Sequence, residues 1–157
     1  MTGPGARRPG AIRLFLGGDV MTGRGIDQIL AHPGDPVLFE GYMTSALGYV
    51  DLAERRTGPL LCGVAHDYVW GALIDEFQDL RLINLETVVT VSDDAAPKGI
   101  NYRMNPANGP VLAAAGINGC MLANNHVLDW GASGLAETLA TLDAAGIGHA
   151  GAGRTGA

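Results

Sequence analysis

Three short polar runs, each directly after an apolar segment, contain the residue types that could bind a metal ion or transfer a proton. In chain order they supply Asp19; Asn84 and Glu86; and Asn124, Asn125 and His126. In an open α/β sheet, ligands bind at the carboxyl ends of the strands, so three such strand ends predict one shared site. Carboxylate oxygen, amide oxygen and imidazole nitrogen together suit a divalent metal ion such as Mn, Mg, Ca or Zn.

Each of these residues also has an explanation that needs no site. Asp19 could cap the helix that follows it, Glu86 could be a solvated surface group, and His126 could be a hydrogen-bonded core histidine. Asn84 and Glu86 are two residues apart, so in an extended chain both side chains point the same way. The convergence of three parallel strand ends favours the site over three separate explanations.

The apolar segments and the breaks between them predict the elements that would position these side chains. Buried strands are expected over residues 12–16, 80–85, 118–123 and 147–150. Helices are expected over residues 22–30, 67–77 and 133–145, with a short one near residues 43–52 in an otherwise irregular segment. Residues 88–91 are expected either to continue the second strand after a bend or to form an edge strand.

Two Ala-Gly-Ile sequences, thirty residues apart, predict the same kind of helix ending. In each, the glycine (Gly116 or Gly146) suits the left-handed residue after the helix. The leucine four residues before that glycine can contact the following isoleucine, as in a Schellman motif. A strand is expected to start after each ending. This repeated helix–strand unit predicts an α/β fold with a mostly parallel sheet, flanking helices and right-handed crossovers.

The composition limits the class of protein. The chain has 157 residues, is 47% hydrophobic and carries a net charge of −6, which fits one domain with a core and argues against nucleic acid as a partner. The first apolar run is too short for a signal sequence or a membrane span, so we expect no membrane span and a cytoplasmic location. Cys62 and Cys120 predict no disulfide framework, and Cys120 is expected in the core.

Two nucleotide-binding motifs can be excluded. Gly18 and Gly23 have the spacing of a P-loop, but Arg24 and Gly25 replace the Lys and Ser/Thr that would contact phosphate and magnesium. Glycines with G-x-G-x-x-G spacing occur at residues 146–151 and 151–156, but no helix is predicted to start in either run, so the dinucleotide-binding fingerprint is not present. Arg103 lies in a polar turn, where it could bind a phosphate or carboxylate with two hydrogen bonds or could simply be solvated.

Taken together, the motifs resemble those of the CapA-type capsule and poly-gamma-glutamate synthesis proteins, a family similar to calcineurin-like metallophosphatases. The sequences that carry the resemblance are Gly18-Asp19-Val20-Met21-x-Gly23-Arg24, Asn84-Leu85-Glu86 and Asn124-Asn125-His126-x-x-Asp129-x-Gly131-x-x-Gly134-Leu135. The resemblance implies that Asp19, Glu86 and Asn125 bind metal. It also implies that His126 transfers protons, with Asp129 as the second catalytic residue. Arg24, within the first motif, and Arg103 are the expected substrate-binding residues.

This sequence departs from the phosphatase pattern in three places. Val20-Met21 follows Asp19, so the usual Asp-x-His pair lacks its histidine, and Asp129 comes three residues after His126 instead of directly after it. The later histidine motifs do not occur before Ala157. Residues 1–11 are rich in Gly, Pro and Arg and are expected to form a disordered tail. The resemblance implies a domain over residues 12–157 that forms one half of a metallophosphatase-like sandwich, to be completed by a second copy or a C-terminal half.

Three functions are compatible with this sequence. The first is a metal-dependent hydrolase that acts on an anionic or peptide-like substrate in capsule or poly-gamma-glutamate biosynthesis. The second is a non-catalytic accessory subunit of a polymer synthesis or export complex, which the missing histidines favour. The third is a metal-assisted peptide isomerase.

Overall fold

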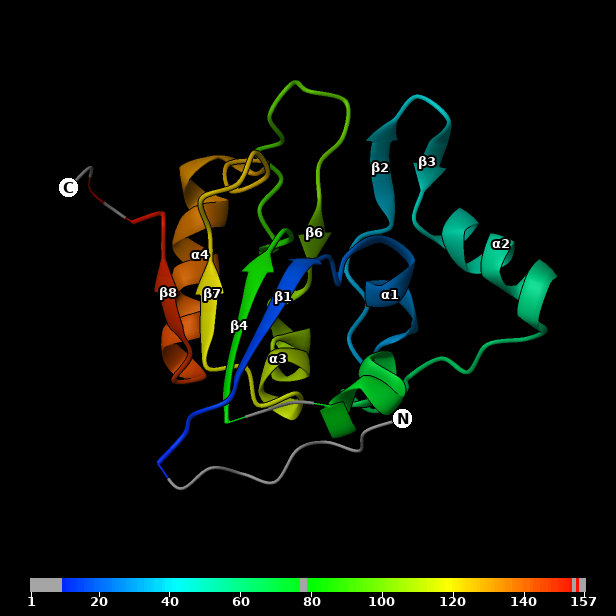
Figure 1. Cartoon of the computed structure of the whole chain (residues 1–157). Helices are drawn as coiled ribbons and strands as arrows, with labels where there is room; N and C mark the ends of the chain where they lie inside the picture. Colours follow the sequence, from blue (N-terminus) through cyan, green and yellow to red (C-terminus); the bar gives the residue numbers. More distant parts are fainter. Residues whose placement is uncertain (1–9, 77–78, 154, 156–157) are drawn as a thin grey trace.

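A four-stranded parallel sheet forms the centre of the protein (Figure 1). The computed structural model describes residues 10–76, 79–153 and 155, so most of the predicted tail at residues 1–11 lies outside the described residues. The strands are adjacent in the order β1 (Leu14–Val20), β4 (Leu80–Leu85), β7 (Gly119–Met121) and β8 (Gly148–Ala150). Each neighbouring pair is parallel. The predicted α/β class with a mostly parallel, helix-flanked sheet is confirmed.

The remaining elements surround this sheet. The helices are α1 (Arg24–Ile29), α2 (Leu47–Thr57), α3 (Pro110–Ala114) and α4 (Gly131–Ala144), with 3-10 segments at Tyr68–Glu76 and Pro106–Asn108. Two small sheets pair β2 (Val37–Glu40) with β3 (Met43–Ser45) and β5 (Val88–Val89) with β6 (Arg103–Met104). Within the described part of the chain, no helix has the length and apolar character needed to cross a membrane.

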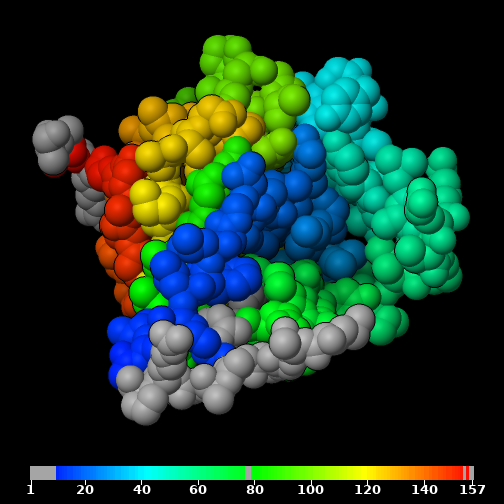
Figure 2. Space-filling model, in the orientation of Figure 1, coloured from blue at the N-terminus to red at the C-terminus, as the bar shows by residue number. Residues whose placement is uncertain are grey.

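The core lies on one face of the central sheet, where α3 and α4 pack (Figure 1). Ile83, Leu85 and Cys120 point into it and are almost completely buried. Leu14, Leu16, Leu80 and Met121 belong to the same strands but are exposed. In Figure 2, the blue atoms of the β1 region lie on the viewed surface. Because parallel sheets are normally covered on both faces, this open face is an unusual feature of the chain.

Both predicted Schellman endings are present. The amide of Ile117 donates to the carbonyl of Leu112 at 3.1 Å, and the amide of Ile147 donates to the carbonyl of Leu142 at 2.9 Å. Gly116 and Gly146 have φ values of +61° and +67°, the left-handed conformation that glycine adopts at low cost. Each ending turns the chain back toward the sheet, where β7 and β8 begin.

The first strand differs from its predicted range of 12–16. It runs from Leu14 to Val20, with a register shift between Leu16 and Asp19 that brings Asp19 opposite Asn84. A Cβ atom on Gly17 would lie 3.0 Å from Cγ2 of Ile83, so glycine allows the close approach of the two strands here. The strand therefore continues through the glycines, and Asp19 lies inside it.

Other predicted elements also have different bounds. The helix predicted over residues 22–30 begins only at Arg24, and the segment near residues 43–52 forms β3 followed by α2. The β2–β3 hairpin was not predicted. Residues 68–76 form 3-10 turns instead of an α-helix because Gly71 has a φ of +51°, which interrupts the helix. Val88–Val89 does not extend β4 but pairs with β6 in a separate two-stranded sheet.

The two faces of the central sheet should respond differently to truncation. We expect Leu16→Ala, at a side chain that is 68% exposed, to lower the free energy of unfolding by less than about 1 kcal/mol. Ile83→Ala, at a side chain that is 1% exposed, should lower it by about 2–5 kcal/mol. Urea unfolding of both variants measures the difference. Equal losses would show that the face bearing Leu16 is covered in solution.

The two cysteines should differ in reactivity. Cys120 is buried, as predicted, and burial raises the pKa of its thiol to about 12, whereas Cys62 is exposed. Only the thiolate reacts, and at pH 8 a thiol with such a pKa is ionised in about one molecule in 10,000. We expect a colorimetric thiol reagent to modify one cysteine per native chain and two per unfolded chain. Rapid modification of both in the native state would contradict the burial of Cys120.

Candidate functional site

The three predicted strand ends meet at one edge of the central sheet. The side-chain amide nitrogen of Asn84 donates to Oδ1 of Asp19 at 2.7 Å and to Oε2 of Glu86 at 2.8 Å. The amide oxygen of Asn84 accepts from Nδ2 of Asn124 at 3.0 Å. A single asparagine side chain therefore links both predicted metal-binding carboxylates to the third strand end.

Asn124, and not its neighbour, enters this network. Its amide nitrogen also donates to the carbonyl of Leu85 at 2.9 Å, and its amide oxygen accepts from the backbone amide of His126 at 3.0 Å. Asn125 is exposed, and its backbone carbonyl accepts from Nζ of Lys98 at 2.7 Å. The role of Asn125 as a metal ligand stays a prediction, whereas Asn124 has a clear role in orienting the loop.

His126 lies between two carboxylates. Its Nδ1 is 2.7 Å from Oδ2 of Asp129, and its Nε2 is 3.6 Å from Oε1 of Glu86. The ring of Tyr102 stacks on the imidazole, with centroids 4.0 Å apart and planes 20° apart. An ionised carboxylate can only accept hydrogen bonds, so Asp129 holds the proton on Nδ1 and leaves Nε2 facing Glu86. Nε2 is therefore the atom at which His126 can take up or release a proton.

Asp129 is completely buried and has a partner for each of its oxygens. Oδ1 accepts from Nζ of Lys98 at 2.6 Å, and Oδ2 accepts from the backbone amide of Tyr102 at 2.6 Å. Its main-chain carbonyl accepts from the amide of Ala96 at 2.8 Å and from Nδ2 of Asn101 at 2.9 Å. Asp129 thus fastens the loop of residues 92–102 to the segment that carries His126.

Arg24 lies beside this group and is held firmly. It has a φ of +52°, a strained conformation for a residue other than glycine. Its Nε and Nη2 each lie 2.6 Å from Oε1 of the buried Glu40, and its guanidinium stacks over the rings of Tyr49 and Tyr102. Burial tends to lower the pKa of Arg24, but the hydrogen bond and charge of Glu40 raise it. Burial, together with the hydrogen bond to Glu40, also raises the pKa of Tyr49.

Arg103 is engaged within the protein as well. Its guanidinium donates to the carbonyl of Ser92 at 3.0 Å, lies 3.5 Å from the carboxylate of Asp35 and sits 4.0 Å above the ring of Trp130. Trp130 is 2% exposed and donates to the carbonyl of Tyr102 at 2.9 Å. Substrate contact by Arg24 or Arg103 stays a prediction, because the contacts seen for both are with neighbouring side chains and backbone.

The basic side chains around the site are paired with other carboxylates and not with Asp19 or Glu86. Arg24, Lys98 and Arg103 are paired with Glu40, Asp129 and Asp35 respectively. Among the residues that the structure describes, neither Asp19 nor Glu86 has a lysine or arginine partner, although Glu86 faces His126. The same described residues contain no group of three His, Cys, Asp or Glu side chains placed to hold a metal ion.

Lys98 and Tyr102 were not identified from the sequence as site residues. The one available signal was that Lys98 is the sole lysine among the ten basic residues of the chain. Neither residue belongs to a periodic pattern, because both lie in an irregular loop. Glu40, which holds Arg24, is the last residue of β2, in a hairpin that was not predicted either.

Comparison with known proteins identifies the family. The family described as "Bacterial capsule synthesis protein PGA_cap" matches residues 13–157. The chain belongs to this family. The expected resemblance is therefore confirmed over nearly the whole length of the chain.

Two sets of proteins are similar to this chain in sequence. A "Probable polyglutamine synthesis accessory protein" from two strains of Mycobacterium tuberculosis is 48% identical over 153 residues, which is 94% of this chain and 40% of the relative. Two proteins of Sinorhizobium fredii, both called uncharacterized, are 52% identical over 83 residues, which is 49% of this chain and 18% of each relative. The chain thus spans about two fifths of the length of the mycobacterial relatives.

Removing the charge of Asp129 should destabilise the site. We expect Asp129→Asn to lower the free energy of unfolding by about 1–3 kcal/mol, because the buried amide loses the ion pair with Lys98 and turns an NH2 group toward other donors. Urea unfolding measures this loss, and a double-mutant cycle with Lys98→Met isolates the pair. Asp93→Asn, at an exposed acid in the same loop, is the matched control and should change stability by less than about 0.5 kcal/mol. Equal effects at Asp93 and Asp129 would contradict the anchoring role.

Proposed function

We propose that this PGA_cap protein takes part in capsule or polyglutamate synthesis as a metal-dependent hydrolase, with Asp19, Glu86 and His126 at its centre. The observation that carries the proposal is the link formed by Asn84, which holds Asp19 and Glu86 at hydrogen-bond distance from one nitrogen atom. His126 lies beside Glu86 with Nε2 available. Two carboxylates without a lysine or arginine partner, next to a histidine with a fixed proton, form a centre for acid–base chemistry on a bound substrate.

The residues present fit a hard divalent cation. Mg²⁺ is commonly bound by one or two carboxylates, with water filling its other positions, whereas zinc sites usually use three or four protein ligands. Asp19 and Glu86 would hold the cation, with Asn125 as the further predicted ligand. This donor set favours Mg²⁺ or Mn²⁺ over Zn²⁺. When bound, the cation would polarise a carbonyl or phosphoryl oxygen and lower the pKa of a coordinated water.

His126 supplies the proton chemistry in this proposal. Asp129 keeps the proton on Nδ1, and Tyr102 fixes the plane of the ring, so Nε2 alone exchanges a proton with substrate or water. Glu86 faces the same atom, with its Oε1 3.6 Å from Nε2, so a proton carried on Nε2 would lie next to a carboxylate. The substrate is anionic or peptide-like, as the family resemblance implies.

A second candidate is a non-catalytic accessory role in the same process. Two observations favour it: the mycobacterial relative is named an accessory protein, and the described residues contain no group of three metal-ligating His, Cys, Asp or Glu side chains. In either role, the open face of the central sheet is a contact surface for a second copy or for a C-terminal half. A cytoplasmic location stays a prediction from the sequence.

Metal binding should depend on the two carboxylates. We expect Mn²⁺ or Mg²⁺, added after chelator treatment, to raise the melting temperature. At 100 times the dissociation constant, the gain in stability should be about 2.7 kcal/mol. Asp19→Asn and Glu86→Gln should each weaken binding in isothermal titration calorimetry, whereas Asp93→Asn, the exposed control, should not. A melting temperature insensitive to millimolar Mn²⁺, Mg²⁺, Ca²⁺ and Zn²⁺ would rule out the metal-dependent hydrolase.

His126 separates the two candidate functions. If the chain is a hydrolase, His126→Ala should leave metal affinity nearly unchanged and abolish turnover of phosphodiester and peptide substrates in the presence of Mn²⁺. If the chain is an accessory subunit, wild type and variant should both bind metal without turnover. Equal loss of metal from His126→Ala and Asp19→Asn would make His126 a ligand instead of a proton carrier.

A further inference from the structure

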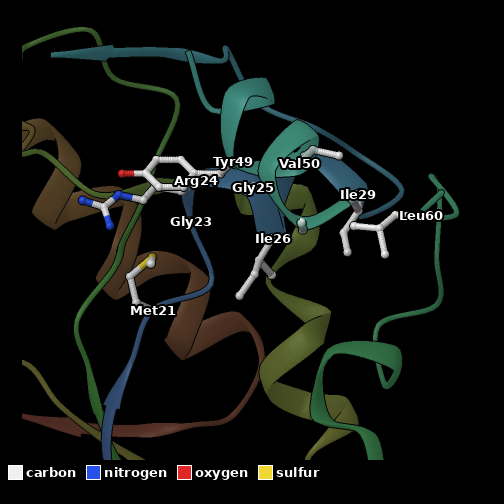
Figure 3. A pocket seen from close by; sticks show the side chains of 10 residues that line it. Met21, Gly23, Arg24, Gly25, Ile26, Ile29, Tyr49, Val50 and Leu60 are labelled. Atoms are coloured by element: carbon white, nitrogen blue, oxygen red, sulfur yellow. The ribbon is translucent and has the colours of Figure 1, made fainter. Parts of the chain in front are cut away.

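A pocket of about 260 Å³ lies between α1 and α2, next to the proposed centre (Figure 3). Its walls are mostly apolar and include Met21, Ile26, Ile29, Val50, Ala53 and Leu60. In Figure 3, Ile26, Ile29 and Leu60 lie at one end, while the guanidinium of Arg24 and the hydroxyl of Tyr49 extend away from them. The pocket therefore has an apolar end and a polar rim.

The rim of the pocket is in direct contact with the residues around His126. Arg24, whose side chain lines the pocket, stacks on Tyr102 at 4.5 Å, and Tyr102 stacks on His126. Met21, on the pocket wall, follows Asp19 by two residues in the chain. A substrate whose reacting bond lies at His126 would therefore have its neighbouring group directed toward this pocket.

One wall of the pocket is anchored in the body of the protein, and the other lies at the surface. Asp27 of α1 is buried and accepts from the amide of Gly34 at 2.8 Å, the amide of Asn105 at 3.0 Å and Nδ2 of Asn108 at 2.8 Å. These bonds hold α1 to the body of the protein. In contrast, α2 has no buried residue and contacts α1 closely at Gly25, where a Cβ atom would lie 3.0 Å from Cβ of Tyr49.

The charges around the pocket decide which group it would accept. Glu40 neutralises Arg24 and also accepts from the hydroxyl of Tyr49, so the rim carries no net charge. In the metal-free protein, Asp19 and Glu86 nearby are negative and would repel an anion. The volume lies just below the range of roughly 300–1,000 Å³ that holds a whole small-molecule ligand, so it suits a single side group.

From these observations we infer that the α1–α2 pocket is a subsite for one uncharged aliphatic or aryl side group of a peptide-like substrate. The inference rests on the proposed function, because it places that group next to the bond on which His126 would act. Of the two proposed substrate classes, anionic and peptide-like, the pocket favours a peptide-like substrate at this position. Apolar contacts with Ile26, Ile29 and Val50 would supply the affinity, and the neutral rim would accept the adjoining amide.

Methyl NMR of the full chain, with labelled isoleucine, leucine and valine, tests the subsite without requiring turnover. The probe is N-acetyl-leucine N-methylamide, which carries a neutral backbone and an isobutyl group. We expect it to shift the methyl signals of Ile26 and Ile29 saturably. N-acetyl-alanine N-methylamide, with three fewer carbons, should bind about tenfold or more weakly. In metal-free protein, the free acid N-acetyl-leucine should also bind more weakly, because its carboxylate enters a negative region.

Two neighbouring residues of α2 provide matched variants. Ala53 lines the pocket, so Ala53→Phe should fill it and abolish the shifts, whereas Leu52 is 49% exposed and does not line it, so Leu52→Phe should leave them unchanged. Val50→Ala, a smaller change on the same wall, should weaken binding several-fold and carries the test if Ala53→Phe does not fold. Circular dichroism checks the fold of each variant.

Three results would overturn the subsite: equal affinity for the leucine and alanine probes, unchanged binding by folded Ala53→Phe, or shifts confined to the open sheet face at Leu16 and Leu80. Asp19→Asn separates this inference from the proposed function, because it should weaken metal binding and leave the affinity for the probe unchanged. If the wild type binds the probe but no metal, the metal-dependent hydrolase is ruled out. The pocket then remains a binding site for a peptide side group.

Discussion

Asp129 carries a carboxylate into the interior of the protein, and the cost of removing that charge from water constrains the structure around it. A buried charge is tolerated only when nearby donors replace the lost hydration. Lys98 and the backbone amide of Tyr102 supply those donors, and both belong to the loop of residues 92–102. His126 uses the remaining position on Oδ2. The orientation of the imidazole is therefore a consequence of how this carboxylate is satisfied.

The second constraint is the parallel arrangement of β1, β4 and β7. It places the carboxyl ends of the strands at one edge, and Asn84, in the middle strand, can reach both neighbours. An asparagine has two donor hydrogens and an acceptor oxygen, so it can bridge two carboxylates and another amide at once. A carboxylate at this position would add a third negative charge, which explains why an amide suits the centre of this group.

Much of this arrangement could be predicted from the sequence, because it follows from local patterns. The Schellman endings expected at Gly116 and Gly146 predicted the repeated helix–strand unit. The polar residues after three apolar runs predicted that three strand ends meet at one edge of the sheet. What could not be predicted depends on contacts between distant segments. The register shift in β1 depends on Gly17 packing against Ile83, and the choice of Asn124 over Asn125 depends on the local turn. Lys98 lies in a loop without periodicity, so only the folded chain shows its partner.

The ion pair of Lys98 and Asp129 also has an evolutionary consequence. The two residues are separated by 31 positions and lie in different structural segments, yet replacing Lys98 alone would leave the completely buried carboxylate of Asp129 without its basic partner. Substitutions at these positions are therefore expected to occur together among PGA_cap proteins. In a relative that retained only one residue of the pair, other contacts would have to hold the loop that corresponds to residues 92–102. The histidine at the position of His126 would then be oriented by a different group.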